Sequence, residues 1–155
     1  MGGIIAALNR DRCLGGVSQN RKGRKMSNKQ EIEVISSYSR AQAIEDGVLI
    51  DVSEIAKEAG FKFPVVVTNN LWASHIEPSE RAKKYGQDRD GRLWDVIWMA
   101  FCAARRSTGG DLIEYDVIFQ NGPGVKWCDT IRLWAHCGPG DNAEPVVTIM
   151  LPEDY

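Results

Sequence analysis

The last third of the chain alternates between apolar and polar residues with a period of two, which is typical of β-strands. Over residues 111–119 one face carries the apolar side chains of Ile113, Tyr115, Val117 and Phe119. Residues 125–137 place Val125, Trp127, Ile131, Leu133 and Ala135 on one side and Lys126, Thr130 and Arg132 on the other. An apolar run, 145–151, follows, and turn-forming residues separate the three segments. The pattern predicts a three-stranded antiparallel meander.

A helical period replaces this alternation over residues 90–110. Apolar residues recur three and four positions apart, and Trp94 and Trp98 add a stripe beside them. Arg105 and Arg106 fall in the last turn, where positive charge is favoured, and two glycines follow. Because apolar residues occupy most of the circumference, we expect this helix to be largely buried against the meander.

Short elements are predicted in the N-terminal half from their capping residues. Ser39 and Gln42 match a capping box, and Ser53 and Thr68 are expected to cap the next two helices. Gly60 suits the left-handed position after a helix. The predicted helices cover 38–47, 54–59 and 69–76, the predicted strand covers 48–53, and 63–68 is a strand or an apolar lead-in. The charged stretch 77–91 is expected to be an exposed excursion.

These elements predict an α+β fold. A C-terminal three-stranded antiparallel meander packs against one long helix, with short N-terminal helices and one or two extra strands. At 155 residues a single domain is the default, and we place it at residues 31–155. Residues 1–30 are predicted to be a flexible basic leader and linker, because 18–30 is polar and lacks periodicity.

Charge is distributed unevenly along the chain. Residues 1–25 hold six of the 19 Lys and Arg residues and one of the 21 Asp and Glu residues, so the remainder has a net charge of −7. This basic leader has two interpretations. Either Met26 is the natural start and the leader is an upstream extension, or Arg21, Lys22, Arg24 and Lys25 form an arm that contacts nucleic acid.

Targeting and metal signals are weak. No apolar run reaches the roughly 20 residues that span a bilayer, and the N-terminus lacks the charge order of a secretory signal, so we expect a cytoplasmic protein without a membrane partner. Cys13, Cys102, Cys128 and Cys137 show no CxxC spacing. A zinc site from the last three with His136 is disfavoured, because adjacent strand residues point to opposite faces. We predict no metal and no cofactor.

The stretch Gly-Pro-Gly-Asp-Asn, residues 138–142, has two interpretations. These residues favour a tight reversal between strands. A glycine-rich loop can also hold an anion with its backbone N–H groups. Pro139 removes one donor and Asp141 adds negative charge, so the hairpin is the stronger prediction.

Trp134 lies on the predicted outward face of its strand, with Lys126, Arg132 and His136. An exposed tryptophan beside arginine and histidine is typical of a protein-binding hot spot and of a base-stacking platform. A second layer, such as the N-terminal helices, would remove this role by covering the face. These four residues are the candidate partner-binding site.

Asp95, His75 and His136 are the candidates for acid–base catalysis. Asp95 lies between Trp94 and Trp98 on the long helix, and apolar surroundings raise the pKa of a carboxyl group. The alternative is a structural bond from Asp95 to Arg92 or to a sheet edge. Because no nucleophile elbow or phosphate-binding loop occurs, enzymatic activity is not the leading hypothesis.

Three separated blocks carry a resemblance to a known family: "YSRAQAIEDGVLIDVSEIAKEAGFKFPVVVT", "DGRLWDVIWMAFCAARR" and "CGPGDNAEPVVTIMLPEDY". Through them residues 34–155 resemble small uncharacterised bacterial proteins that plasmids, phages and conjugative elements carry. The resemblance supplies no catalytic residues. It implies a mobile-element setting, in which accessory proteins often bind host components, including restriction and CRISPR systems.

The leading hypothesis is a mobile-element accessory protein that docks onto a host protein or protein complex and inhibits defence or nucleic-acid processing. The acidic body is too weakly charged for a DNA mimic, which favours docking on protein. A small Asp/His enzyme and a nucleic-acid binder that uses the basic leader are the alternatives.

Overall fold

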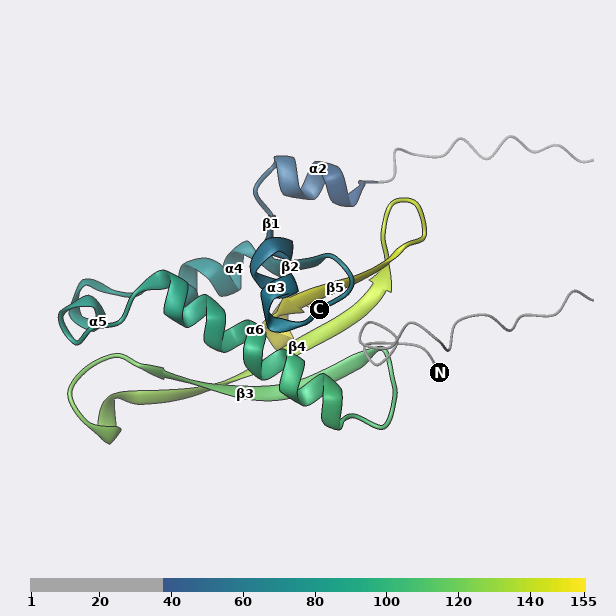
Figure 1. The fold of residues 1–155 in the computed structure, drawn as a ribbon. Helices are drawn as coiled ribbons and strands as arrows, with labels where there is room; N and C mark the ends of the chain where they lie inside the picture. Colours follow the sequence, from purple (N-terminus) through teal and green to yellow (C-terminus); the bar gives the residue numbers. More distant parts are fainter. Residues whose placement is uncertain (1–37) are drawn as a thin grey trace, which may run out of the picture.

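The computed structural model describes residues 38–155, and every element below lies in that range (Figure 1). The helices are α2 (Arg40–Glu45), α3 (Ser53–Ala59), α4 (Asn69–Leu71), α5 (Glu80–Lys84) and α6 (Arg89–Arg106). The strands are β1 (Leu49–Asp51), β2 (Val65–Thr68), β3 (Leu112–Gln120), β4 (Cys128–Pro139) and β5 (Pro145–Met150). A π-helical turn, Trp72–Ile76, continues α4, and 3₁₀ turns cover Val125–Trp127 and Pro152–Asp154.

The strands form one mixed sheet in the order β1-β2-β5-β4-β3. β3, β4 and β5 pair antiparallel in chain order, which confirms the predicted meander and the α+β class. β2 pairs in parallel with β5, and β1 pairs antiparallel with β2, so the two N-terminal strands extend the sheet. β3 and β1 are therefore its edges, and β3 is much the longer.

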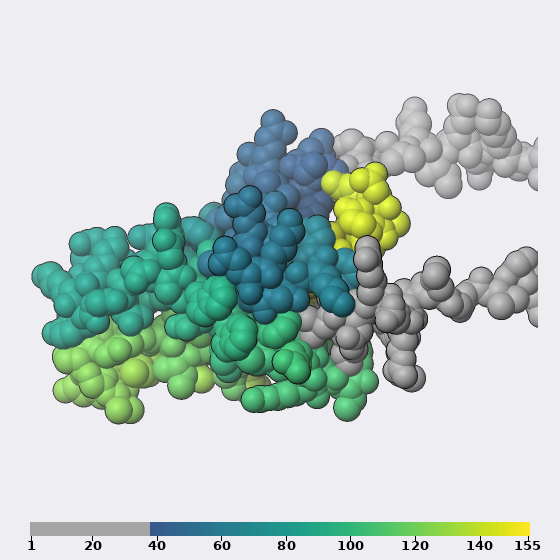
Figure 2. Space-filling model, in the orientation of Figure 1, coloured from purple at the N-terminus to yellow at the C-terminus, as the bar shows by residue number. Residues whose placement is uncertain are grey.

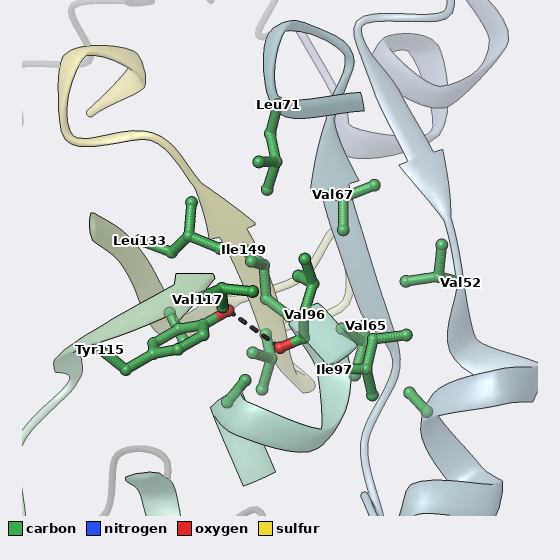
Figure 3. Packing of buried hydrophobic residues seen from close by; sticks show 14 of the residues in the cluster. Val52, Val65, Val67, Leu71, Val96, Ile97, Tyr115, Val117, Leu133 and Ile149 are labelled. Atoms are coloured by element: carbon green, nitrogen blue, oxygen red, sulfur yellow. Dashed lines mark hydrogen bonds between the residues drawn. The ribbon is translucent and has the colours of Figure 1, made fainter. Parts of the chain in front are cut away.

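α6 lies across one face of the sheet and packs on β3 (Figure 1). The predicted inward face of β3 is buried, with each of its four apolar side chains at most 7% exposed. The Tyr115 hydroxyl donates a 3.3 Å hydrogen bond to the carbonyl of Val96 on α6 (Figure 3). That bond satisfies a hydroxyl group whose burial would otherwise destabilise the fold.

A second, smaller group of apolar residues is buried on the opposite face. Val66, Val146 and Met150 alternate with the core residues of β2 and β5, so they face away from α6. Ala43 of α2 is also buried and lies outside the main core cluster. The thin second layer does not extend over the β3 side, where Asp116 and Ile118 are exposed.

Residues 140–144 connect β4 to β5 as a hairpin, and Gly138 and Pro139 still pair with β5, so the predicted reversal between the strands is confirmed. The loop also has a partner within the chain. The Asp141 carboxylate accepts hydrogen bonds of 2.8 and 3.0 Å from the backbone N–H groups of Arg40 and Ala41. Those groups belong to the first turn of α2, where helical N–H groups lack intrahelical acceptors. Asp141 therefore caps α2 from the far end of the sequence.

The predicted caps are confirmed at three of four positions. Ser39 and Gln42 form a reciprocal capping box, Thr68 accepts from the Leu71 N–H, and Gly60 adopts a left-handed φ of 109° after α3. The prediction for Ser53 is wrong, because α3 begins at this residue and its hydroxyl does not cap the helix.

Ser53 instead links α3 to the sheet. Its hydroxyl donates to the Asp51 carboxylate and accepts from the Val65 N–H at 3.1 Å. The short polar side chain therefore joins β1 and β2 at the start of the helix, a local use that competes with capping.

The predicted strand over 125–137 begins later than expected. Val125 and Trp127 lie in a 3₁₀ turn, and Val125 is 88% exposed. Trp127 folds back onto Gly122, where an added Cβ would lie 2.9 Å from the indole ring. The tryptophan therefore packs on its own turn, which removes it from the strand alternation.

The predicted burial of α6 around most of its circumference is wrong. Its core-facing residues are the ones expected, namely Leu93, Val96, Ile97, Ala100 and Ala104. The other side of the helix is exposed to solvent, where Trp94, Trp98 and Met99 are 36%, 43% and 38% exposed. The charged stretch before it is exposed as predicted, although it contains the short helix α5.

Candidate functional site

Three aromatic side chains follow one another along the outward side of α6. The Trp94 and Trp98 rings stack with centroids 6.0 Å apart and 10° between their planes. The Phe101 ring continues the stack 5.7 Å from Trp98. We call Trp94, Trp98 and Phe101 the aromatic row. The row presents two indole rings to solvent, which is a large apolar surface to leave uncovered.

The aromatic row is fixed to the core at its Phe101 end. Phe101 meets the buried ring of Phe61 edge to face, with centroids 5.6 Å apart. It also packs against Gly60, where an added Cβ would approach the Phe101 ring to 2.9 Å. The Arg105 guanidinium lies 5.9 Å from the centroid of the same ring. The row is thus held in place before any ligand binds, so binding would cost little side-chain entropy.

Charged groups surround the exposed side of α6. Burial beside the helix raises the pKa of the Asp95 carboxyl, although the residue as a whole is exposed. Arg105 and Arg106 are exposed in the last turn. Figure 2 shows the α6 segment at the surface, between the N-terminal elements and β3. An apolar centre with a charged rim is the usual make-up of a protein interface.

The predicted partner-binding residues are partly brought together. Trp134 and His136 are half-buried, because Tyr155 covers both, with ring centroids 5.4 and 5.6 Å away. Arg132 is exposed farther along β4, and its guanidinium bonds the Asp116 carboxylate at 3.0 Å. Lys126 lies in the 3₁₀ turn before the strand. The C-terminal residue, not an N-terminal helix, thus provides the cover over Trp134.

The structure does not assemble Asp95, His75 and His136 into one site. Asp95 lies on the outward side of α6, and the His75 ring stacks on Phe119 at 5.6 Å on the core face of β3. His136 points to the other face of the sheet. Burial lowers the pKa of His75, and no hydrogen bond within residues 38–155 joins any two of the three side chains.

Arg92 is a buried charged residue that the sequence pattern did not identify. It is 4% exposed, and its guanidinium donates to the carbonyls of His75 at 2.8 Å and Gln120 at 2.7 Å. A third bond of 2.9 Å reaches the Asn121 side chain. Arg92 therefore ties the π-helical turn and the β3–β4 turn to α6, and the predicted alternative of a bond to Asp95 is not formed.

Other chemistry is limited in the part of the chain that the structure describes. Within it, no three His, Cys, Asp or Glu side chains lie together so that they could share a metal ion. None of its helices combines the length and the apolar character that a membrane span requires. The proposed nucleic-acid arm, with Arg21, Lys22, Arg24 and Lys25, falls outside the described residues.

The chain belongs to a family of unknown function, DUF6573, which matches residues 26–155. The match begins at Met26 and leaves the basic leader outside it. No curated protein and no solved structure matches the chain. The resemblance to an uncharacterised family is thus confirmed, whereas the mobile-element setting stays a prediction.

Proposed function

We propose that this member of the DUF6573 family is a binding protein that docks onto another protein through the exposed side of α6. The observation that carries the proposal is the aromatic row, in which Trp94 and Trp98 are stacked and exposed while Phe101 holds them to the core. Tryptophan is the residue most enriched among those that dominate protein–protein binding energy.

The chemistry of the surface favours a protein partner over nucleic acid. Residues 38–155 hold 12 Lys and Arg against 18 Asp and Glu residues, a net charge of −6. A body of this charge repels phosphate, whereas nucleic-acid binding depends on cationic contacts to the backbone. Stacked indoles can nevertheless stack on bases, so single-stranded nucleic acid is the second candidate that this geometry favours.

The partner we propose is a host protein or protein complex, and the consequence we propose is inhibition of a host defence or nucleic-acid-processing system. Support for this setting comes from the resemblance to proteins of plasmids, phages and conjugative elements. The β4 face around Trp134 supports docking less well, because Tyr155 already packs over the indole ring.

Affinity capture from a host lysate, followed by mass spectrometry, tests the proposal with matched variants. The double substitution Trp94→Ala and Trp98→Ala removes the two exposed rings of the row, and Val125→Ala removes an even more exposed apolar side chain elsewhere. We expect wild type and Val125→Ala to retain the same protein and the double variant to lose it. The captured protein is then purified and titrated against each variant.

Two results contradict the proposal. Retention of the purified partner by the double variant at unchanged affinity would move the site away from α6. Loss of binding with Trp134→Phe, which keeps an aromatic ring, would assign the site to the β4 face. Titration with single-stranded oligonucleotides tests the second candidate function, which is binding of single-stranded nucleic acid. Stacking of bases on the indole rings predicts salt-dependent binding that the double variant lacks.

A further inference from the structure

β3 forms the longer of the two edges of the sheet. β3 pairs with β4 along all nine of its residues, and among the described residues no strand lies on its other side. That side therefore offers a row of backbone N–H and C=O groups to an incoming strand. It contains no proline, and the exposed side chain of Ile118 lies along it, 64% exposed.

A groove runs beside the first half of this edge. Its volume is about 610 Å³, and it lies between the C-terminal half of α6 and residues 112–116 of β3. The α6 wall consists of Met99, Cys102, Ala103 and Arg106. The groove is thus bounded on one side by a helix and on the other by an open strand edge.

We propose that this edge and groove bind an extended segment of a partner protein, which pairs with β3 as an added strand. Main-chain hydrogen bonds to β3 would supply affinity, and alternate side chains would enter the groove, since strand side chains alternate between faces. The wall formed by Met99, Cys102 and Ala103 calls for aliphatic residues at those positions. This inference rests on the proposed function, protein docking, but uses residues outside the aromatic row.

The opposite face of the added strand meets a negative surface. Glu114 is exposed and forms no hydrogen bond or ion pair within residues 38–155; its charge acts on Arg132 only at longer range, because Arg132 is bonded to Asp116. A lysine or arginine opposite Glu114 would complete a cross-strand charge pair. The net charge of −6 on the described residues also favours a cationic segment. The proposed ligand is therefore a strand with aliphatic residues on one face and cationic residues on the other.

A second copy of this chain fits the edge less well than an isolated segment. Antiparallel self-pairing centred on residue 114, 115 or 116 places Glu114 opposite Glu114, Glu114 opposite Asp116, or Asp116 opposite Asp116, and each pairing of carboxylates is destabilising. Self-pairing centred on Val117 brings the partner's Phe119 toward the groove. In each copy the Phe119 ring packs against the His75 ring, 5.6 Å away, and the Arg92 guanidinium, 5.4 Å away. The groove would therefore have to accommodate the His75 and Arg92 side chains of the second copy as well as its strand.

Selection from a random peptide library displayed on phage, with the full chain as bait, tests the inference. We expect enriched peptides to alternate aliphatic residues with lysine or arginine. Synthetic copies of those peptides should slow hydrogen exchange at outward-pointing N–H groups of β3. Ala103→Trp, which fills the groove, should abolish binding, and Ala73→Trp, at an exposed position away from it, should not.

Glu114→Lys is the second variant, because an exposed substitution preserves the fold even if Ala103→Trp does not. It should weaken the cationic peptides by about fivefold, as expected for an exposed ion pair. The inference would be overturned by selected peptides that do not alternate aliphatic and cationic residues, or by peptides with an acidic consensus. Equal binding of the peptides to wild type and to all variants would also overturn it. So would a dimer, seen by light scattering, in which β3 amides are protected without peptide. Trp94→Ala with Trp98→Ala should leave peptide binding intact, so the groove and the aromatic row can fail independently.

Discussion

Replacing Arg92 with methionine tests whether a buried charge organises the molecule around α6. Methionine keeps much of the side-chain length but donates no hydrogen bonds. The substitution removes three bonds of 2.7 to 2.9 Å to His75, Gln120 and Asn121. It also removes a longer bond of 3.4 Å to the Gln87 side chain. It also leaves two backbone carbonyls, on separate turns, without their partner.

The expected loss follows from these bonds. A hydrogen bond from a charged donor contributes about 1.5–3 kcal/mol, and each buried acceptor left without a donor costs about 1–3 kcal/mol. Part of this loss is offset, because the guanidinium no longer has to be desolvated; burial already lowers the pKa of Arg92. We therefore expect Arg92→Met to lower the free energy of unfolding by about 3–5 kcal/mol.

Urea denaturation followed by tryptophan fluorescence measures this change, with Arg89→Met as the matched control. Arg89 lies on the same helix but is exposed, and within residues 38–155 it forms one ion pair, a 3.2 Å contact with Asp90. Such surface pairs contribute about 0–1 kcal/mol, so the control should stay close to wild type. An Arg92→Met variant within about 1 kcal/mol of the control, at an unchanged denaturant slope, would refute the proposed role.

Two further predictions concern a cap and a close contact. Backbone N–H groups of α2 lower the pKa of the Asp141 carboxyl. The stabilisation that this cap gives to α2 is therefore complete above the ordinary aspartate pKa and disappears as pH falls through the lowered pKa. Amide exchange in the first turn of α2 should accelerate over that acidic range in wild type but be fast and pH-independent, after correction for intrinsic rates, in Asp141→Ala, which has no side-chain acceptor. Gly86→Ala, at a φ of 81° with open space around it, should cost about 1–2 kcal/mol by backbone strain alone. Gly60→Ala should cost clearly more in the same denaturation assay, because its Cβ also meets Phe101; equal losses would remove the proposed contact.

The sequence predicted the parts of the fold that depend on local periodicity. In β3 every second residue from Ile113 to Phe119 is buried, because the pleat alone decides which face each side chain takes. The parallel pairing of β2 with β5 was not predictable in this way. Val65–Thr68 carries no alternation, since both its faces are covered, and such a run does not specify its neighbour in the sheet.

The candidate site was harder to predict than the fold, because exposure depends on distant residues. Trp134 lies on the outward face as predicted, but Tyr155, at the end of the chain, packs over it. Trp94 and Trp98 were counted toward burial of α6 because they are apolar. The angular positions of the two tryptophans around the helix axis would have predicted their exposure. At about 100° per residue they lie on the far side of the helix from Val96 and Ala100.

This angular separation makes the docking proposal testable without unfolding the protein. The core-facing residues of α6 and the aromatic row occupy different sides of one helix, so substitutions in the row leave the core-facing side chains unchanged. Truncating the two tryptophans forfeits their stacking, worth about 0.5–1.5 kcal/mol, and part of their contact with Phe101. A folded domain of this size tolerates that loss, whereas an interface centred on two tryptophans would not. Binding and stability should therefore separate in the Trp94→Ala and Trp98→Ala variant, and a parallel loss of both would show that α6 needs its outward side for folding rather than for docking.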